Sequence, residues 1–241
     1  MDLLCAGGSR AGLAALCVTD HYDRDGHFEA ASYLAAYEKA RAAIAITSRL
    51  DFMMGVEIGE GHLDPEGASA LLAELPFDFV LGSCHYIEGM ADFYLMDYES
   101  GAHCDRLIGQ YAEELRRMIT WGAFDVLGHL TYPLRYMKGR GGFDVDFPAE
   151  AAHDIFRALI ARGIGLEVNV SNLRRGGRPE PDLPLLKLYR ACGGEIATVG
   201  SDAHNAGDVG ANIADGMALL REAGFAHVAL YRGRKPEFVA L

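Results

Sequence analysis

The strongest constraint on the fold is a short apolar stretch, rich in β-branched residues, that recurs six times along the chain. Each copy carries, at or near its end, a polar side chain that is able to bind a metal ion. Neighbouring copies are roughly 30–45 residues apart, the length that a strand, a helix and two short loops require. The copies are residues 12–21, 51–59, 78–85, 124–130, 165–172 and 195–204. This repeat predicts alternating strands and helices.

The segments between these strands have the periodicity of helices, with apolar side chains at spacings of three and four. Gly163 and Gly224 stand where a glycine commonly ends a helix. Strands that are apolar almost throughout and alternate with helices are typical of a parallel sheet buried on both faces. No linker interrupts the pattern, so we expect one domain over residues 1–241. The expected helices are 27–47, 105–121, 149–162 and 208–223.

A parallel sheet of this kind either closes into a barrel or stays open with helices on both sides. No GxGxxG or P-loop motif follows any strand, which excludes the usual nucleotide-binding forms of the open sheet. Polar residues at the carboxyl ends of six strands converge on one point only when the sheet closes, and in barrels that face carries the chemistry. We therefore expect an α/β barrel similar to a TIM barrel.

Composition narrows the possible partners. The 241 residues hold 22 basic and 34 acidic side chains, a net charge of −12, which disfavours binding to nucleic acid or to an anionic membrane. No apolar run approaches the roughly 20 residues of a membrane span, and the amino-terminal segment lacks the features of a signal peptide. Five scattered cysteines without a CxxC motif indicate reduced thiols and a cytoplasmic protein.

The metal-capable side chains at the strand ends form the candidate functional site. A single histidine is more often structural than functional, but chance would not place six such residues at strand ends. Imidazoles and carboxylates that share cations are the ligands of a hydrolytic metal centre, where a bound water becomes acidic. Asp202 and His204 would face the same way if their strand continued that far. The candidates are His21, Glu57, His85, His129, Asp202 and His204.

The order and spacing of six motifs make a family resemblance specific. The motifs TDHYD, GVEIG, GSCHYIEG, GHLTYP, EVNVSN and GSDAH resemble those of the PHP (polymerase and histidinol phosphatase) superfamily. The runs GSCHYIEGMADFY and VALYRGRKP resemble its monofunctional histidinol-phosphatase branch. The resemblance implies a distorted (β/α)7 barrel with three metal ions. It also implies hydrolysis of L-histidinol phosphate to L-histidinol and phosphate by a metal-activated hydroxide.

The resemblance also implies roles for individual residues. Glu57 resembles a carboxylate that bridges two ions, with His85 and His129 as further ligands of the second ion. Glu57, Asp202 and His204 are the implied catalytic residues. The remaining implied ligands are Asp202 for the first ion, and His21 and His204 for the third.

The implied phosphate site lies beside the metal ions. Arg135 follows GHLTYP, and Arg174 and Arg175 follow EVNVSN, where this branch is expected to hold its phosphate. A guanidinium fork suits phosphate oxygens better than a point charge does. Asn169 and Ser171 match a polar segment at the barrel mouth, and Asn169 is included among the substrate-binding candidates.

One family feature has no match in this sequence. The resemblance implies a first strand with an HxH pair and a further histidine, whereas residues 1–12 read as a helix that would follow such a strand. We therefore expect a barrel without that strand, fewer than three bound ions and weak turnover. The alternatives are a phosphoesterase acting on another small ester or nucleotide, and a remnant that only binds metal or a partner.

The donor set and the charges near the barrel mouth indicate which metals and substrates the site would accept. Mixed imidazole and carboxylate ligands suit Zn, Mn or Fe alike. The substrate's cationic groups would suit an acidic barrel mouth, for which Glu88, Asp92 and Asp97 are candidates. The expected partner is a small phosphate ester, not nucleic acid or membrane, and the oligomeric state is undetermined.

Overall fold

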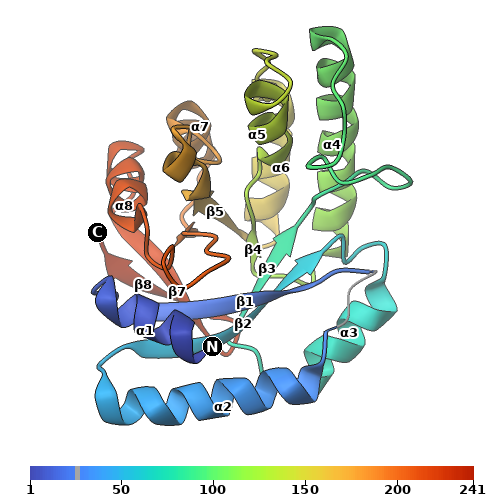
Figure 1. Cartoon of the computed structure of the whole chain (residues 1–241). Coiled ribbons are helices and arrows are strands. Elements are labelled where there is room, and N and C mark those ends of the chain that lie inside the picture. Colours follow the sequence, from blue (N-terminus) through green and yellow to red (C-terminus); the bar gives the residue numbers. More distant parts are fainter. Residues whose placement is uncertain (25–27) are drawn as a thin grey trace.

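A computed structural model describes residues 1–24 and 28–241 of the chain. Six parallel strands form one sheet in the order β1-β2-β3-β4-β5-β6, and the sheet curls into a half-barrel (Figure 1). This architecture confirms the expected α/β class and resembles a distorted TIM-like barrel. The strands are β1 (Ala15–Tyr22), β2 (Asp51–Gly59), β3 (Phe79–Ser83), β4 (Val126–Leu127), β5 (Gly165–Asn169) and β6 (Ala197–Gly200).

Helices connect the strands and cover the outside of the sheet. Four of them confirm the expected segments, although position 27, where the first was expected to begin, lies outside the described residues. The helix expected at 208–223 begins later, because a turn with Gly210 and Asn212 at positive φ precedes it. The helices are α1 (Asp2–Arg10), α2 (Ala30–Thr47), α3 (Pro65–Glu74), α4 (Gly101–Trp121), α5 (Tyr132–Gly139), α6 (Ala149–Ala161), η1 (Ser171–Arg175), α7 (Leu183–Ala191) and α8 (Ile213–Glu222).

The core lies between the sheet and this helical layer. Every residue of β3, β4 and β5 is buried, as is all of β2 after Asp51. Such burial on both faces explains why these strands are apolar almost throughout. On the outside, α4 presents one apolar stripe to the sheet and packs against α6. No helix among the described residues is both long and apolar enough to cross a membrane.

Within the described residues, the two ends of the sheet are strands with one neighbour each. β1 pairs only with β2, and β6 pairs only with β5. A cavity of about 550 Å³ lies between these two edges and is lined by side chains from both strands. The structure thus has the six parallel strands expected here, and the sheet does not close between β1 and β6.

A carboxyl-terminal hairpin, which was not predicted from the sequence, covers the amino ends of the strands. It consists of β7 (His227–Arg232) and β8 (Lys235–Ala240), which pair antiparallel. Ala229 and Tyr231 pack against Phe79 and Val126 at the start of β3 and β4. The hairpin therefore closes the end of the half-barrel opposite the carboxyl ends of the strands.

Arg234 at the hairpin turn fixes this closure. Its Nε donates to Asp125 Oδ1 and Oδ2 at 2.8 and 2.6 Å, and its Nη2 donates to the Ala123 carbonyl. Hydrogen bonds to charged groups contribute about 1.5–3 kcal/mol each. We expect Arg234→Ala to lower the free energy of unfolding by about 2 kcal/mol in urea titrations. The neighbouring exposed Lys235→Ala is the control, and equal unfolding midpoints for the two variants would contradict this role.

Candidate metal centre

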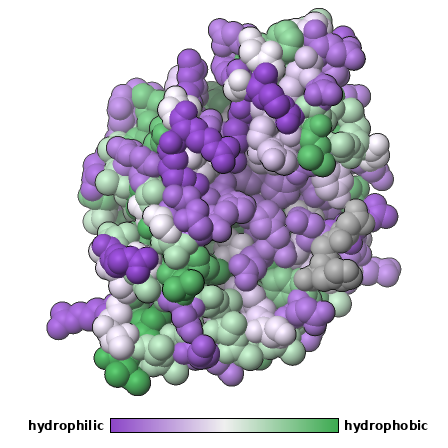
Figure 2. Space-filling view, in the orientation of Figure 1, coloured by the Kyte–Doolittle hydropathy of each residue, from purple (hydrophilic) through white to green (hydrophobic). Residues whose placement is uncertain are grey.

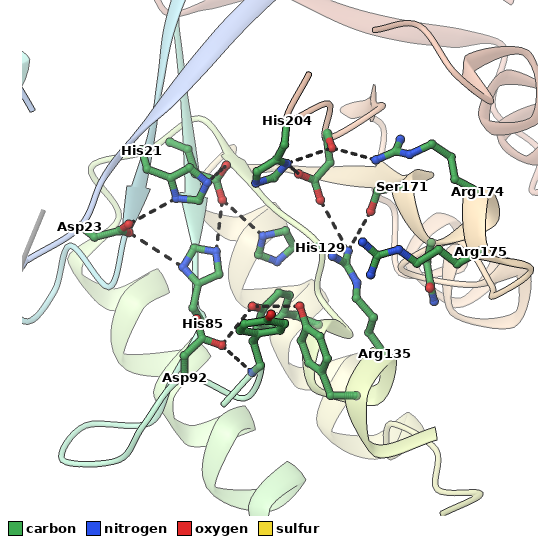
Figure 3. A pocket seen from close by; sticks show the side chains of 16 residues that line it. His21, Asp23, His85, Asp92, His129, Arg135, Ser171, Arg174, Arg175 and His204 are labelled. Atoms are coloured by element: carbon green, nitrogen blue, oxygen red, sulfur yellow. Dashed lines mark hydrogen bonds and ion pairs between the residues drawn. The ribbon is translucent and has the colours of Figure 1, made fainter. Parts of the chain in front are cut away.

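The carboxyl ends of the first four strands bring three imidazoles around one carboxylate (Figure 3). The Nε2 atoms of His85 and His129 lie 3.4 and 3.3 Å from Glu57 Oε1. His21 Nε2 lies 3.6 Å from Glu57 Oε2. Since parallel strands end at the same edge of a sheet, side chains far apart in the sequence meet here. The expected convergence of these four side chains is present.

These separations fit donors that share a metal ion. Two donors bound to a tetrahedral Zn²⁺ at about 2.0–2.1 Å are about 3.4 Å apart. His21, Glu57 and His85 offer ligand atoms that all lie within 4.8 Å of one another. Neutral imidazole and carboxylate are ligands of Zn, Mn and Fe alike. The donor set therefore fits a divalent ion beside Glu57.

The charges at this centre favour a cation. Burial alone would raise the pKa of Glu57, but the facing imidazoles outweigh burial and hold that pKa well below its usual value. The contact with Asp23 and the charge of Glu57 raise the pKa of His21 to about 9. The negative charge that favours a protonated imidazole at His21 also favours a metal cation, which binds to the imidazole in competition with that proton.

Asp202 and His204 lie on the other side of His21, but not on a strand. β6 ends at Gly200, so the strand does not continue as far as Asp202 and His204, which was the condition for the two side chains to face the same way along it. The backbone instead turns at Asp202, which has a φ of +47°. His204 Nδ1 lies 3.3 Å from Asp202 Oδ1, and the rings of His204 and His21 are 6.1 Å apart. The turn thus brings the two side chains to the centre that the strand was expected to reach.

A polar cavity of about 520 Å³ opens over this centre. All six predicted metal ligands line it, as do all three predicted phosphate-binding arginines. Figure 2 shows hydrophilic side chains gathered around a hollow on this face of the molecule. The cavity has room for a small organic phosphate and places cations on one wall and metal ligands on the other.

Arg135 on α5 is held by a buried carboxylate. It donates from Nε and Nη2 to Glu180 at 3.1 and 2.9 Å, and from Nη2 to Ser171 Oγ at 3.0 Å. Its Nη2 also lies 3.6 Å from Asp202 Oδ2. Burial would lower the pKa of Arg135, but the charge of Glu180 raises it, so the guanidinium stays charged. Much of its fork is therefore already occupied.

The other predicted substrate-binding residues differ in how far they are committed. Arg174 donates to the backbone carbonyls of Ser201 and Asp202 and thereby stabilises the turn. The side chain of Arg175 is exposed and, among the described residues, has neither a hydrogen bond nor an ion pair. Asn169 does not line the cavity; its amide donates to Asp202 Oδ2 at 3.2 Å and accepts from the Ser171 N–H.

Sequence reasoning missed several residues of the site. Asp23 lies between the imidazoles of His21 and His85, and Glu60 lies behind His85. Burial raises the pKa of Glu60 to about 7. Asp23 stands two residues after His21 within TDHYD, which is a usable signal, whereas nothing in the sequence marks Glu60.

Comparison with known proteins gives consistent results. The sequence is 27% identical over 237 residues to a probable histidinol-phosphatase of Thermotoga maritima, a match that covers 95% of this chain and 88% of the relative. It is 28% identical over 241 residues to a probable histidinol-phosphatase of Deinococcus radiodurans, covering 93% and 87% of the two chains.

The fold has a counterpart among solved structures. It resembles the crystal structure of histidinol phosphate phosphatase from Lactococcus lactis, complexed with Zn, L-histidinol and phosphate, with a TM-score of 0.77 at 21% identity. That alignment covers 98% of this chain and 91% of the other. The family model of the PHP domain matches residues 1–171, which is well over half of the sequence. The chain therefore belongs to the PHP domain family.

Proposed function

We propose that this chain is a metal-dependent phosphomonoesterase that hydrolyses L-histidinol phosphate to L-histidinol and phosphate. The observation that carries the proposal is the cavity in which three imidazoles surround Glu57 while three arginines line the same space. The choice of substrate is supported by two relatives, each named probable histidinol-phosphatase, that align over most of both chains.

The metal-binding part of the proposal assigns Glu57, His85 and His129 to one ion, with His21, Asp202 and His204 beside them. Bound divalent ions supply Lewis acidity, which makes water a nucleophile at neutral pH and offsets charge on the phosphoryl oxygens. We expect Zn, Mn or Fe and fewer than three ions, because the two groups of three donors among the described residues, one with Glu57 and one with Asp23 and Glu60, share His85.

In this proposal the arginines orient the phosphate. The guanidinium of Arg175 is uncommitted, so it is free to bind phosphate oxygens. Arg135 and Arg174 contribute positive charge to the cavity. The guanidinium of Arg135 is bound to Glu180, and that of Arg174 is bound to the backbone of the turn at Asp202. The chain's own residues thus place the phosphorus between the cationic wall and the metal ligands.

Arg175→Ala tests this division of labour. A charge-assisted contact is worth about 1.5–3 kcal/mol, so we expect phosphate to inhibit the variant at least about tenfold more weakly. Arg178→Ala is the matched control, because Arg178 is exposed nearby and does not line the cavity. An unchanged inhibition constant in Arg175→Ala would remove Arg175 from the phosphate site.

One wall of the cavity is acidic and aromatic and can bind the organic part of the substrate. Asp92 lines the cavity and accepts from the Tyr132 hydroxyl at 3.1 Å. Of the acids expected to receive the substrate's ammonium or imidazole, Glu88 lies outside this cavity beside Arg117, and Asp97 is exposed outside it. We therefore assign the cationic end of the substrate to Asp92.

The test of substrate is a comparison of phosphate release. Purified protein loaded with Zn²⁺ or Mn²⁺ is assayed with L-histidinol phosphate beside simple monoesters and mononucleotides. We expect the highest kcat/KM for L-histidinol phosphate. A higher value for another ester would identify a different PHP phosphoesterase, and metal binding without release from any ester would favour the non-catalytic alternative.

The proposal also includes the setting of the enzyme. We infer a cytoplasmic protein, supported by five free cysteines. We further propose that residues 1–241 act as one domain, supported by a hydrophobic cluster that extends from α1 to β7.

A further inference from the structure

The carboxylate of Asp23 faces two of the imidazoles at the candidate metal centre, those of His21 and His85. It follows β1 in the loop, two residues after His21. Its Oδ2 lies 3.4 Å from His21 Nδ1, and its Oδ1 lies 4.0 Å from His85 Nδ1. The opposite nitrogens of both rings point toward Glu57 (Figure 3). The two imidazoles are thus placed between a carboxylate on the metal side and a second carboxylate behind.

The residues around Asp23 leave room for its carboxylate beside the two imidazoles. Asp23 Oδ1 is buried and has no hydrogen-bond partner among the described residues. A Cβ atom at Gly59 would clash with that oxygen and would lie 3.4 Å from His85 Nδ1. The carboxylate therefore occupies its place only because position 59 carries no side chain.

Glu60 adds a second carboxylate on the same side of His85. Its Oε1 accepts the backbone N–H groups of His85 and Tyr86 and lies 3.8 Å from His85 Nδ1. Glu60 is 1% exposed, and its Oε2 has no hydrogen-bond partner among the described residues. The loop that follows β2 therefore holds a buried carboxyl group beside His85 Nδ1, on the side of the ring that does not point to Glu57.

A carboxylate behind a histidine ligand controls the tautomer and the orientation of the imidazole ring. A neutral imidazole that offers Nε2 to a cation carries its proton on Nδ1, and a carboxylate at Nδ1 fixes that tautomer and the ring orientation. It also makes the ligand more basic. A single aspartate that faces two Nδ1 atoms does this for two ligands at once.

We propose that Asp23, supported by Glu60 at His85, is a positioning residue that presents the Nε2 atoms of His21 and His85 to the metal centre around Glu57. The inference rests on the metal centre of the proposed function but not on its substrate. It is therefore tested by metal affinity, whatever ester the protein hydrolyses.

The first test compares zinc affinity in the whole protein. Asp23→Asn keeps the size of the side chain and removes the charge, and loss of such a partner typically weakens metal binding by about 10–100-fold. We expect this loss in competition titrations with a chromophoric chelator. Asp20→Asn is the matched control, because Asp20 lies in the same motif and its side chain has no hydrogen bond or ion pair within the described residues. Equal affinities for the two variants would overturn the proposal.

Two further variants separate positioning from general loss of structure. Gly59→Ala retains Asp23, but the added methyl group displaces the Asp23 carboxylate. This variant is therefore expected to weaken zinc binding as well. In a His21→Ala/His85→Ala background, Asp23→Asn is expected to have little further effect, because the residues through which it acts are gone. Circular dichroism of the metal-free variants checks folding.

Three further outcomes contradict the proposal. The first is an undiminished effect of Asp23→Asn in the double-alanine background. The second is normal zinc affinity in a folded Gly59→Ala protein. The third is the loss of one ion from the saturating stoichiometry with no change in the affinity for the others, which would make Asp23 a ligand in its own right. Failure of phosphatase activity alone affects the proposed function and not this inference.

Discussion

Glu57→Gln is expected to abolish phosphate release, lowering the rate by about a thousandfold or more. The carboxylate faces three imidazole nitrogens at 3.3–3.6 Å and is almost completely buried. An amide of the same shape carries no charge and turns an NH₂ group toward one of the ligands. The variant therefore loses the negative charge that holds the ion. It also loses the second carboxylate oxygen through which two ions could share one ligand.

The measurement is phosphate release together with bound metal per chain, both for purified, folded protein. Glu38→Gln on the exposed face of α2 is the control for loss of one negative charge. A Glu57→Gln protein with parental turnover and parental metal content would show that the ion is held elsewhere.

Arg135→Ala is expected to lower the free energy of unfolding by about 3–5 kcal/mol. Glu180 is 3% exposed, and Arg135 donates to both of its carboxylate oxygens. Removal of the guanidinium leaves a buried carboxyl without its counter-charge, and this costs more than the same change at the surface. The variant also loses the cation that lies over the Tyr132 ring, with 5.4 Å between them.

The pH dependence identifies the cause of this loss. Burial already raises the pKa of Glu180 to about 7, and without Arg135 it rises further. A carboxyl whose pKa is higher in the folded than in the unfolded state favours the folded state as pH falls. The penalty of Arg135→Ala should therefore be smaller at about pH 5 than at about pH 8, and Arg135→Ala/Glu180→Gln should recover part of the stability. Urea titrations at the two pH values check this, and a pH-independent penalty would point to lost packing alone.

The repeat of apolar stretches was sufficient to predict the sheet, because strands buried on both faces leave a continuous apolar signal. β2 coincides with the predicted 51–59 for this reason. β4 is only two residues long, and β6 ends before Asp202, because the chain turns there at a positive φ. A single-residue turn of this kind leaves no pattern in hydrophobicity.

Three short helices, α3, α5 and α7, were missed, although their starts carry a signal. α3, α5 and α7 each have a proline in the first helical turn, where its missing N–H costs nothing. The hairpin of β7 and β8 turns at Gly233 and Arg234, both at positive φ, which is the signature of a two-residue loop. The prolines were readable from the sequence, whereas the positive φ of Arg234 was not.

The candidate site was predictable where candidate ligands end strands and not where residues depend on tertiary contacts. Glu57 and the three facing histidines were predicted as ligands from position and chemistry alone. Glu180 and Glu60 were not, because their roles arise from burial beside Arg135 and His85, which lie far from them in the sequence. The difference between Arg135 and Arg175 likewise depends on a partner that only the folded chain provides.

The most direct test of a metal-dependent phosphatase is phosphate release from L-histidinol phosphate as metal-free protein is titrated with Zn²⁺. Bound zinc and the initial rate are measured at each step, with Glu57→Gln protein in parallel. We expect no release from the metal-free chain, a rate that rises with zinc bound at the Glu57 centre, and neither binding nor release in the variant. Full activity without metal, or a zinc-loaded and folded chain that releases no phosphate, would contradict the proposed function.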